Sequence, residues 1–174
     1  MQLSFYDASV TCYQQILDST ANILEKGRDY ANSEGMPLSD LVNYQLHETM
    51  FPLSFQVISV WHHSHGAIKG MREGVFSPPP SKPDIDYAGL CALIDEARQS
   101  MASESLASME ALSGNKMMFK MGEMEIPFIT ENFLATFSKP NFYFHAATTY
   151  SILRQIGVPL GKRDFLGAMK IGHD

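Results

Sequence analysis

The chain has 174 residues, of which 45% are hydrophobic and 18% are charged, so it can bury the core of one globular domain, which we expect to cover residues 1–174. Its 13 basic and 19 acidic residues give a formal net charge of −6, and no basic run is longer than Lys162-Arg163, so no nucleic-acid partner is expected. The start lacks the basic and apolar regions of a signal peptide, and no apolar run approaches the roughly 20 residues of a membrane span. We therefore expect a cytoplasmic protein with no membrane partner.

The first predicted helix runs from Phe5 to about Ala31, because apolar residues recur there with the spacing of one helix face. The Asn-Ser-Glu-Gly sequence that ends at Gly35 stops it. A second helix begins near Pro52, which would kink or break a helix that passed through it, and ends near Gly74. The predicted buried stripe of this helix consists of Leu53, Val57, Val60, Trp61, Ser64, Ile68 and Met71.

A stiff, extended linker follows the second helix, because residues 77–84 read SPPPSKPD and four prolines cannot continue a helix. Asp86 is predicted to cap a third helix that ends around Gly114. The residues of the next segment, 116–127, alternate roughly about Gly122, which predicts a small β-hairpin.

The last long helix is predicted between Pro140, which suits a first helical turn, and Gly157, with a short helical lead-in that begins at Thr130. One face of this helix should point into the protein, and it carries His145, Thr148, Thr149, Ile152 and Ile156. Together these elements predict an all-α four-helix bundle with a short β-hairpin-like insert before the last helix.

His145 is the main catalytic candidate, because it lies at the polar end of an otherwise apolar stripe. His47 precedes the break at Pro52, and we expect it to face His145 across the bundle, where two imidazoles would supply an acid and a base or half of a metal site. The alternatives are a core histidine bonded to a neighbouring hydroxyl for His145, and a capping or surface histidine for His47.

Three further histidines, His62, His63 and His65, lie on the second helix. His62 and His65 share a face and could bind a metal, but the pair alone is a weak signal. On a helical wheel His62 and His63 fall mostly away from the buried stripe and His65 lies at its edge, so we predict that this cluster is solvated or lies at an interface.

Motifs of the common hydrolase, nucleotide-binding and zinc-protease folds are absent from the sequence, which leaves a pocket of aromatic, methionine, threonine and histidine side chains. The predicted hydrogen-bond donors beside the two catalytic histidines are Thr149 and Tyr150. The side chains predicted to bind the substrate are Tyr13, Met50, Trp61, His65 and Phe142.

Two segments resemble a known family: residues 140–167, PNFYFHAATTYSILRQIGVPLGKRDFLG, and residues 48–57, ETMFPLSFQV. In combination they are similar to the family called domain of unknown function 1993, a branch of the DinB/YfiT-like superfamily, and the resemblance extends over essentially the whole chain. It implies a four-helix bundle of the DinB kind, with the short hairpin before the last helix as a family feature.

DinB-like relatives that bind a divalent metal typically use one histidine of the second helix and an H-x-x-x-H pair on the fourth. The resemblance implies that His145 matches the first member of that pair and His47 the second-helix histidine, but Thr149 stands where the second member would be. Two ligands are too few for a tight zinc site. No cofactor is therefore expected, and zinc or nickel would bind only at a degenerate site that His65 or Glu48 completed.

Three functions are compatible with this pattern. The first is a metal-independent enzyme that acts on a hydrophobic small molecule, an isomerase, cyclase or lyase of the kind used in secondary metabolism, with His145 and His47 as acid and base. The second is a metal-dependent hydrolase or transferase like other DinB relatives. The third is a non-catalytic protein that binds a small molecule or dimerises, and a homodimer is compatible with all three.

Overall fold

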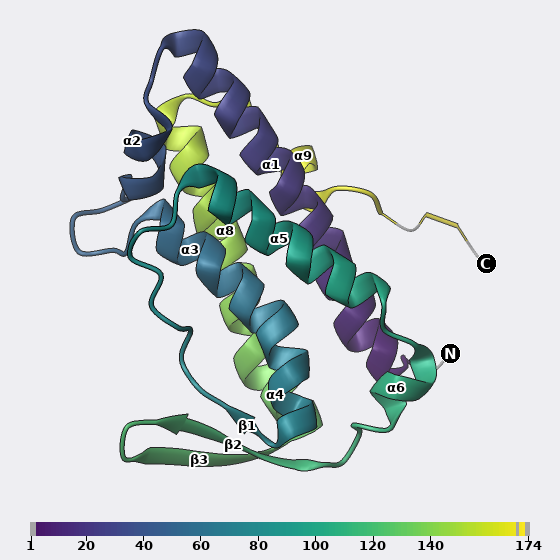
Figure 1. Cartoon of the computed structure of the whole chain (residues 1–174). Coiled ribbons are helices and arrows are strands. Elements are labelled where there is room, and N and C mark those ends of the chain that lie inside the picture. Colours follow the sequence, from purple (N-terminus) through teal and green to yellow (C-terminus); the bar gives the residue numbers. More distant parts are fainter. Residues whose placement is uncertain (1–2, 170, 173–174) are drawn as a thin grey trace.

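The computed structural model describes residues 3–169 and 171–172 and shows four long helices with a small sheet at one end (Figure 1). The long helices are α1 (Cys12–Glu34), α3 (Leu53–Trp61) continued by the π-helical η2 (His62–Gly66) and α4 (Ala67–Glu73), α5 (Tyr87–Ala102) and α8 (Lys139–Ile156). The shorter helical segments are η1 (Asp7–Thr11), α2 (Leu38–Asn43), α6 (Leu106–Glu110), α7 (Thr130–Phe133), η3 (Leu134–Ser138) and α9 (Lys162–Leu166). The strands are β1 (Val75–Phe76), β2 (Lys116–Met121) and β3 (Met124–Ile129).

This architecture confirms the predicted all-α bundle with a β-hairpin before the last helix. The linker at 77–84 carries the chain from the sheet end of the bundle back towards the start of α5 (Figure 1). Within the part of the chain that the structure describes, no helix is long and apolar enough to cross a membrane. His173 lies outside the described residues.

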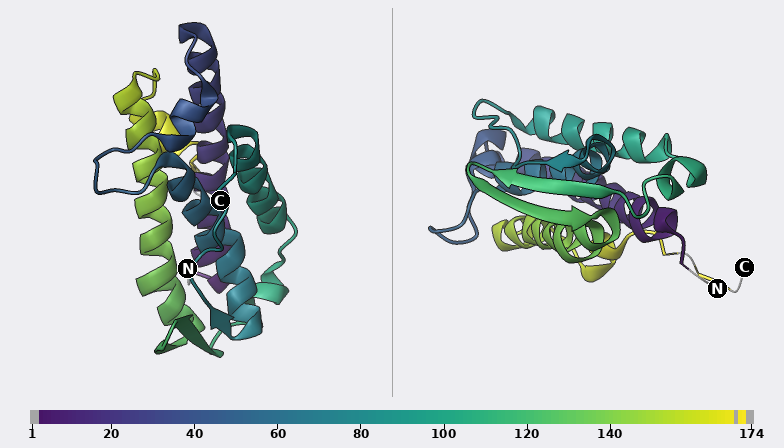
Figure 2. Two further views of the ribbon diagram at one scale, coloured as in Figure 1. Left: turned by 60° about the vertical axis from the view of Figure 1, so that its left-hand side comes forward. Right: turned by 90° about the horizontal axis from the view of Figure 1, so that it is seen from below.

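The predicted hairpin is formed by β2 and β3, which pair antiparallel. Gly122 occupies the tight turn with a φ of 57°, a left-handed conformation that residues with a Cβ rarely adopt. The sequence pattern did not indicate β1, which pairs parallel with β2 and places Phe76 opposite Phe119. This third strand ties the end of the second helix to the hairpin, and the sheet therefore lies across the end of the bundle (Figure 2).

The third helix is shorter than predicted. The expected end near Gly114 is wrong, because α5 ends at Ala102 and the separate helix α6 follows. Ser105 starts α6 with a capping box, in which the side chains of Ser105 and Ser108 each bond to the other's backbone N–H. Serine favours such helix ends because its hydroxyl competes for nearby backbone groups. The side chain of Asp86 caps the start of α5, as predicted.

The last helix is part of a continuous helical stretch from Thr130 to Ile156, made of α7, η3 and α8. Pro140 lies in the first turn of α8, as predicted, directly after the π-helical η3. Proline has no N–H to donate to the preceding turn, so a backbone carbonyl there needs another donor. In the same turn, the side-chain amide of Asn141 donates an additional hydrogen bond to the carbonyl oxygen of Phe137 at 2.7 Å.

Phenylalanine rings join the sheet to the bundle. The ring centroids of Phe119, on β2, and Phe137, on η3, are 4.9 Å apart, and those of Phe76, on β1, and Phe133, on α7, are 5.1 Å apart. These rings are buried or half-buried, so they fix the sheet against the helices. The cluster lies beside η2, where His62, His63 and His65 are found.

Candidate functional site

His145 on α8 and Gln56 on α3 meet where these two helices pack against each other. The Oε1 of Gln56 lies 2.8 Å from the Nδ1 of His145, and the Nε2 of Gln56 donates to the carbonyl oxygen of Phe51 at 2.9 Å. Because the amide nitrogen is already directed at a carbonyl, Oε1 is the atom that faces the imidazole, and Nδ1 of His145 must carry the hydrogen. The side chain of Gln56 is only 2% exposed, so this arrangement is held within the core. His145 is therefore presented with Nε2 as its free, basic nitrogen.

His63 on η2 is the second imidazole of the site. Its ring is nearly parallel to that of His145, with centroids 6.0 Å apart and an interplanar angle of 15°. His63 is 7% exposed, and its buried Nδ1 has no hydrogen-bond partner among the described residues. A buried nitrogen without a partner is costly, so such groups are rare and tend to mark functional positions.

The prediction that His62 and His63 are solvated or lie at an interface is wrong, because both are buried in the protein. His62 stacks on Phe76, with centroids 4.4 Å apart, and its Nε2 lies 2.6 Å from the carbonyl oxygen of Ser77. The segment that follows the helix folds back over it, so the helix is buried on more than one face. A helical wheel with one buried stripe cannot represent such a helix, and η2 departs from the regular helical spacing as well.

Burial determines the charge of both imidazoles. Desolvation lowers the pKa of His145 to about 4. Desolvation, with smaller contributions from His62 and His145, lowers the pKa of His63 to about 3. Both rings are therefore neutral near pH 7, and each can act as a hydrogen-bond donor at one nitrogen and an acceptor at the other.

Three phenylalanines form an apolar group at the imidazole of His145, two in contact with it and one behind them, and we call them the aromatic rim: Phe51, Phe55 and Phe144. The rings of Phe55 and Phe144 meet His145 edge to face, with centroids 5.8 and 5.2 Å away, and Phe51 stacks on Phe55 at 4.3 Å. Phe51 is 63% exposed and Phe144 is 58% exposed, whereas His145 is half-buried. The rim thus forms an apolar surface that extends from the imidazole to solvent.

The expectation that His47 faces His145 is not met. His47 is exposed and lies in the loop between α2 and α3, where its Nδ1 is 2.9 Å from the hydroxyl of Thr49. Because α3 begins only after Pro52, residues before this proline do not belong to the helix. Met50 lies in the same loop, and its carbonyl accepts a hydrogen bond from Gln45. Gln56 and His63 occupy the position that was predicted for His47.

Thr149 lies one turn after His145 on α8, but its hydroxyl donates to the carbonyl oxygen of His145 at 2.9 Å. This bond within the helix satisfies the hydroxyl hydrogen, so Thr149 shapes the site without donating to a ligand. Tyr150 is not brought to the site, because its ring packs edge to face against Phe165 of α9, with centroids 6.1 Å apart.

Trp61 and His65 form a separate hollow of about 340 Å³ beneath the first prolines of the linker. Their rings stack with centroids 5.7 Å apart, and the ammonium of Lys82 lies 5.3 Å from the centre of the Trp61 ring. None of the five hollows characterised in the described residues is lined by His145. Trp61 and His65, which were predicted to bind the substrate, therefore line a hollow that His145 does not reach.

Tyr13 and Phe142 are fully buried and pack edge to face, with centroids 4.8 Å apart. The hydroxyl of Tyr13 bonds to that of Ser138 at 2.8 Å, and Ser138 donates to the backbone carbonyl of His63 at 2.7 Å. These side chains hold the backbone of His63 from behind, so they support the site and do not face a ligand.

The sequence profile described as domain of unknown function (DUF1993) matches residues 5–166, which is nearly the whole chain. The chain belongs to the DUF1993 family. Comparison of this DUF1993 protein with curated proteins gives no match. Among solved structures, a DinB family member from Shewanella denitrificans is 23% identical, with a TM-score of 0.78 over 97% of this chain and 95% of that one. This likeness confirms the expected DinB-like fold.

The residues of this DUF1993 chain do not fit the three-ligand metal site that its fold family implies. Thr149 stands where a second histidine of α8 would be needed, and His47 lies exposed in the loop before α3 and does not face His145. In the described part of the chain, no three His, Cys, Asp or Glu side chains lie close enough to hold a metal ion together. Tight zinc binding requires three or four such ligands.

Gln56 and His63 were not predicted as site residues. Gln56 is a polar residue within the apolar segment LSFQVISV, and it follows Pro52 in one of the two motifs that resemble this family. His63 follows Gln56 by two helical turns and lies on the same face. An amide and an imidazole at this spacing on a buried helix are the signal that could have identified the pair.

Proposed function

We propose that this DUF1993 protein is a metal-independent enzyme, an isomerase, cyclase or lyase that moves protons on a hydrophobic small molecule, with Nε2 of His145 as the base. The observation that carries the proposal is the 2.8 Å hydrogen bond between Gln56 and His145, because it leaves the basic nitrogen of a neutral imidazole free. Such reactions need a proton acceptor, a proton donor and a fixed substrate orientation, and none of them requires a cofactor. Secondary metabolism and the cytoplasm are the proposed setting.

In the proposed reaction, His145 removes a proton from the substrate at Nε2 and becomes an imidazolium. Nδ1 keeps its hydrogen and its bond to Gln56, so the amide oxygen stabilises the positive charge as it develops. The same proton then returns to a different substrate atom in an isomerisation or cyclisation, or to the leaving group in an elimination. The proton that His145 removes is the proton that it returns, so the reaction requires no added oxidant or reductant.

The aromatic rim is the proposed binding surface for the substrate. Phe55 and Phe144 are in contact with the imidazole, so an apolar substrate packed on these rings would bring its reacting atom beside Nε2. Because a base with a pKa of about 4 is weak, the substrate proton must be acidic, for example one next to a carbonyl group. Hydrophobic ketones and enones are therefore the first substrates to test.

The test is deuterium exchange. The protein is incubated in heavy water with a panel of hydrophobic ketones and enones, and mass spectrometry follows deuterium uptake at carbon. His145→Gln should slow protein-dependent exchange at least about 100-fold, whereas the control His47→Gln should leave it unchanged. Exchange that persists in His145→Gln, or that disappears in His47→Gln, would refute the role of His145.

A second candidate function is a non-catalytic protein whose aromatic rim makes a homodimer, and the exposure of Phe51 and Phe144 favours it. Sedimentation analysis tests it, since Phe144→Asp would convert a dimer to a monomer. Phe165→Asp, at the half-buried ring beside Tyr150, is the control at a separate place. A monomeric wild-type protein would remove this candidate and leave the rim to a small molecule.

A further inference from the structure

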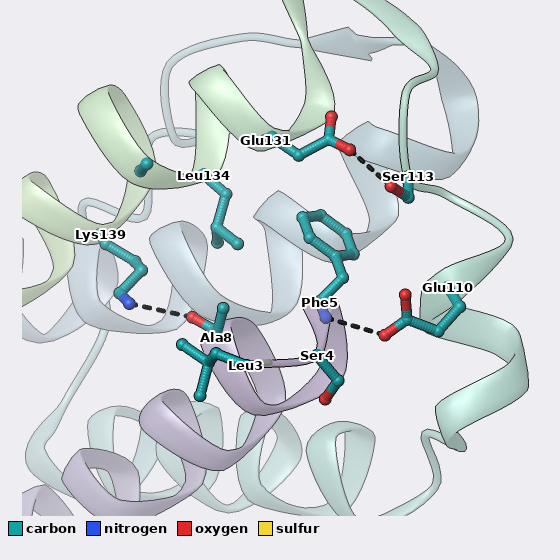
Figure 3. A pocket seen from close by; sticks show the side chains of 10 residues that line it. Leu3, Ser4, Phe5, Ala8, Glu110, Ser113, Glu131, Leu134 and Lys139 are labelled. Atoms are coloured by element: carbon teal, nitrogen blue, oxygen red, sulfur yellow. Dashed lines mark hydrogen bonds between the residues drawn. The ribbon is translucent and has the colours of Figure 1, made fainter. Parts of the chain in front are cut away.

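Another hollow lies where the start of the N-terminal helix meets α6 and the helical stretch from α7 to the first turn of α8 (Figure 3). It has a volume of about 630 Å³, which is sufficient for a small organic molecule. Neither His145 nor any residue of the aromatic rim lines it. The hollow is thus separate from the imidazole site.

Charges of opposite sign lie on opposite sides of this hollow. Lys139 is on one side, Glu110 and Glu131 are on the other, and the apolar side chains of Leu134 and Phe5 lie between them (Figure 3). Phe5 and Leu134 are both buried, so they form a firm apolar floor. A charged group at each end of an apolar floor is complementary to a molecule with the same pattern reversed.

The two carboxylates are held in place by donors from the protein. One oxygen of Glu110 accepts the backbone N–H of Phe5 at 2.8 Å, which leaves the other oxygen available. Glu131 accepts from the hydroxyl of Ser113 at 2.5 Å and from the backbone N–H of Gly114 at 2.8 Å. The Ser113 bond also lowers the pKa of Glu131, so this carboxylate is charged at neutral pH.

Lys139 is similarly fixed, because its ammonium donates to the carbonyl oxygen of Ala8 at 2.9 Å. That bond uses one of three N–H groups and does not neutralise the charge. Considering the described residues only, neither Lys139 nor the two glutamates has an ion-pair partner, in contrast to Lys120, which pairs with Glu125. Three fixed charges without ionic partners therefore surround one apolar floor.

We infer that this hollow binds a small zwitterion: a molecule whose carboxylate lies beside Lys139, whose ammonium lies beside Glu110 and Glu131, and whose apolar chain covers Phe5 and Leu134. Each charge of the ligand would meet an opposite charge that is already positioned, so little side-chain ordering is required on binding. The ligand class is that of amino acids with separated charged ends. The inference does not depend on catalysis at His145.

The probe is ε-aminocaproate, which carries both charges on a flexible apolar chain, and two-dimensional amide NMR follows its binding. We expect saturable shifts at the amides of Gly114 and Phe5. Caproate and n-hexylamine, which carry one charge each, should bind several-fold more weakly, because each loses one ionic contact. Equal affinity for all three compounds, or no shifts with ε-aminocaproate, would overturn the inference.

Three variants at the hollow and two controls elsewhere locate the site. Lys139→Met should lose most of the affinity, and Lys139→Arg should retain it because the charge is kept. Glu110→Gln should also weaken binding, and it keeps an oxygen that can accept from Phe5, so the fold is preserved. Lys120→Met, on the hairpin, and His145→Gln should bind like the wild type. Wild-type affinity in Lys139→Met, or lost affinity in Lys120→Met, would contradict the placement of the ligand in this hollow. Because His145→Gln should still bind the ligand, the result of this test is separate from that of the proposed enzymatic activity.

Discussion

The amide oxygen of Gln56 lies 2.8 Å from Nδ1 of His145, and this bond joins the second and the last long helices through a buried polar pair. A buried amide must be hydrogen-bonded at both ends, and Gln56 achieves this with Phe51 and His145. The pair therefore sets the tautomer of the imidazole and does not leave it to solvent.

Gln56→Glu should raise the pKa of His145 from its depressed value of about 4, because a carboxylate beside Nδ1 stabilises the imidazolium. The substitution keeps the size of the side chain. NMR titration of the imidazole protons measures the pKa directly. Gln155→Glu, at an exposed position of α8, is the control and should leave His145 unchanged. A titration of His145 that is the same in Gln56→Glu and the wild type would show that the two side chains are not in contact.

Stability should fall as the solution is acidified. The pKa values of His145 and His63 are about 4 and about 3 in the folded protein, below the 6.5 of an unperturbed histidine. Between 6.5 and these lower values the unfolded chain binds protons that the folded protein does not, so the free energy of unfolding decreases as the pH falls through this window. The dependence fades at about one pH unit above 6.5, where the histidines are neutral in both states.

Urea unfolding at a series of pH values tests this dependence. His63→Phe keeps a ring beside Phe137 and removes one titrating group. Its free energy of unfolding should therefore fall less steeply between about pH 6.5 and pH 4 than that of the wild type. The carboxylates, which are the same in both proteins, contribute equally to both slopes. The difference between the two slopes therefore reports the titration of His63. Identical slopes would mean that His63 titrates normally in the folded state.

Tyr13→Phe should lower the free energy of unfolding by about 1 kcal/mol, because it removes a buried hydrogen bond to Ser138. The loss is limited, since the hydroxyl of Ser138 still donates to the carbonyl of His63. Chemical denaturation measures it. Tyr150→Phe is the control, because Tyr150 is only half-buried, and its change should be close to zero. A larger effect at Tyr150 than at Tyr13 would contradict the role of the Tyr13–Ser138 bond.

Gly27→Ala should destabilise the protein by about 1–3 kcal/mol although alanine is the better helix former. A Cβ at this position of α1 would lie 2.8 Å from the hydroxyl of Tyr87 and 3.2 Å from Leu153. The Tyr87 hydroxyl donates to the carbonyl of Leu24 at 2.6 Å, and the added methyl would displace it. A double-mutant cycle with Tyr87→Phe tests the cause: the combined loss should be smaller than the sum of the two single losses. Simple additivity would point to a different source of strain.

Local signals in the sequence predicted most of the fold. Gly157, which has a φ of 114°, ends the last helix, and Asp86 caps the third helix, as such residues do in many proteins. The end of α5 was missed because Ser105 starts a new helix whose apolar spacing continues that of the old one. Parallel pairing of β1 depends on contacts distant in sequence, and a strand of two residues carries no periodic pattern.

The candidate site was predictable only in part. His145 was identified because it lies on an apolar stripe, but its partners depend on how two helices meet in space. His47 lies near Gln56 in sequence, yet Pro52 separates the loop from the helix, so only Gln56 reaches the core. His63 was assigned to the wrong side because the wheel assumed one buried face.

The most direct test of this account is nitrogen NMR of the His145 side chain at neutral pH, in the wild type and in Gln56→Leu. We expect a neutral ring in the wild type with its hydrogen on Nδ1 and a pyridine-type Nε2, and a loss of this tautomer preference in the variant. A wild-type imidazole that is protonated on both nitrogens, or that carries its hydrogen on Nε2, would contradict the proposed base.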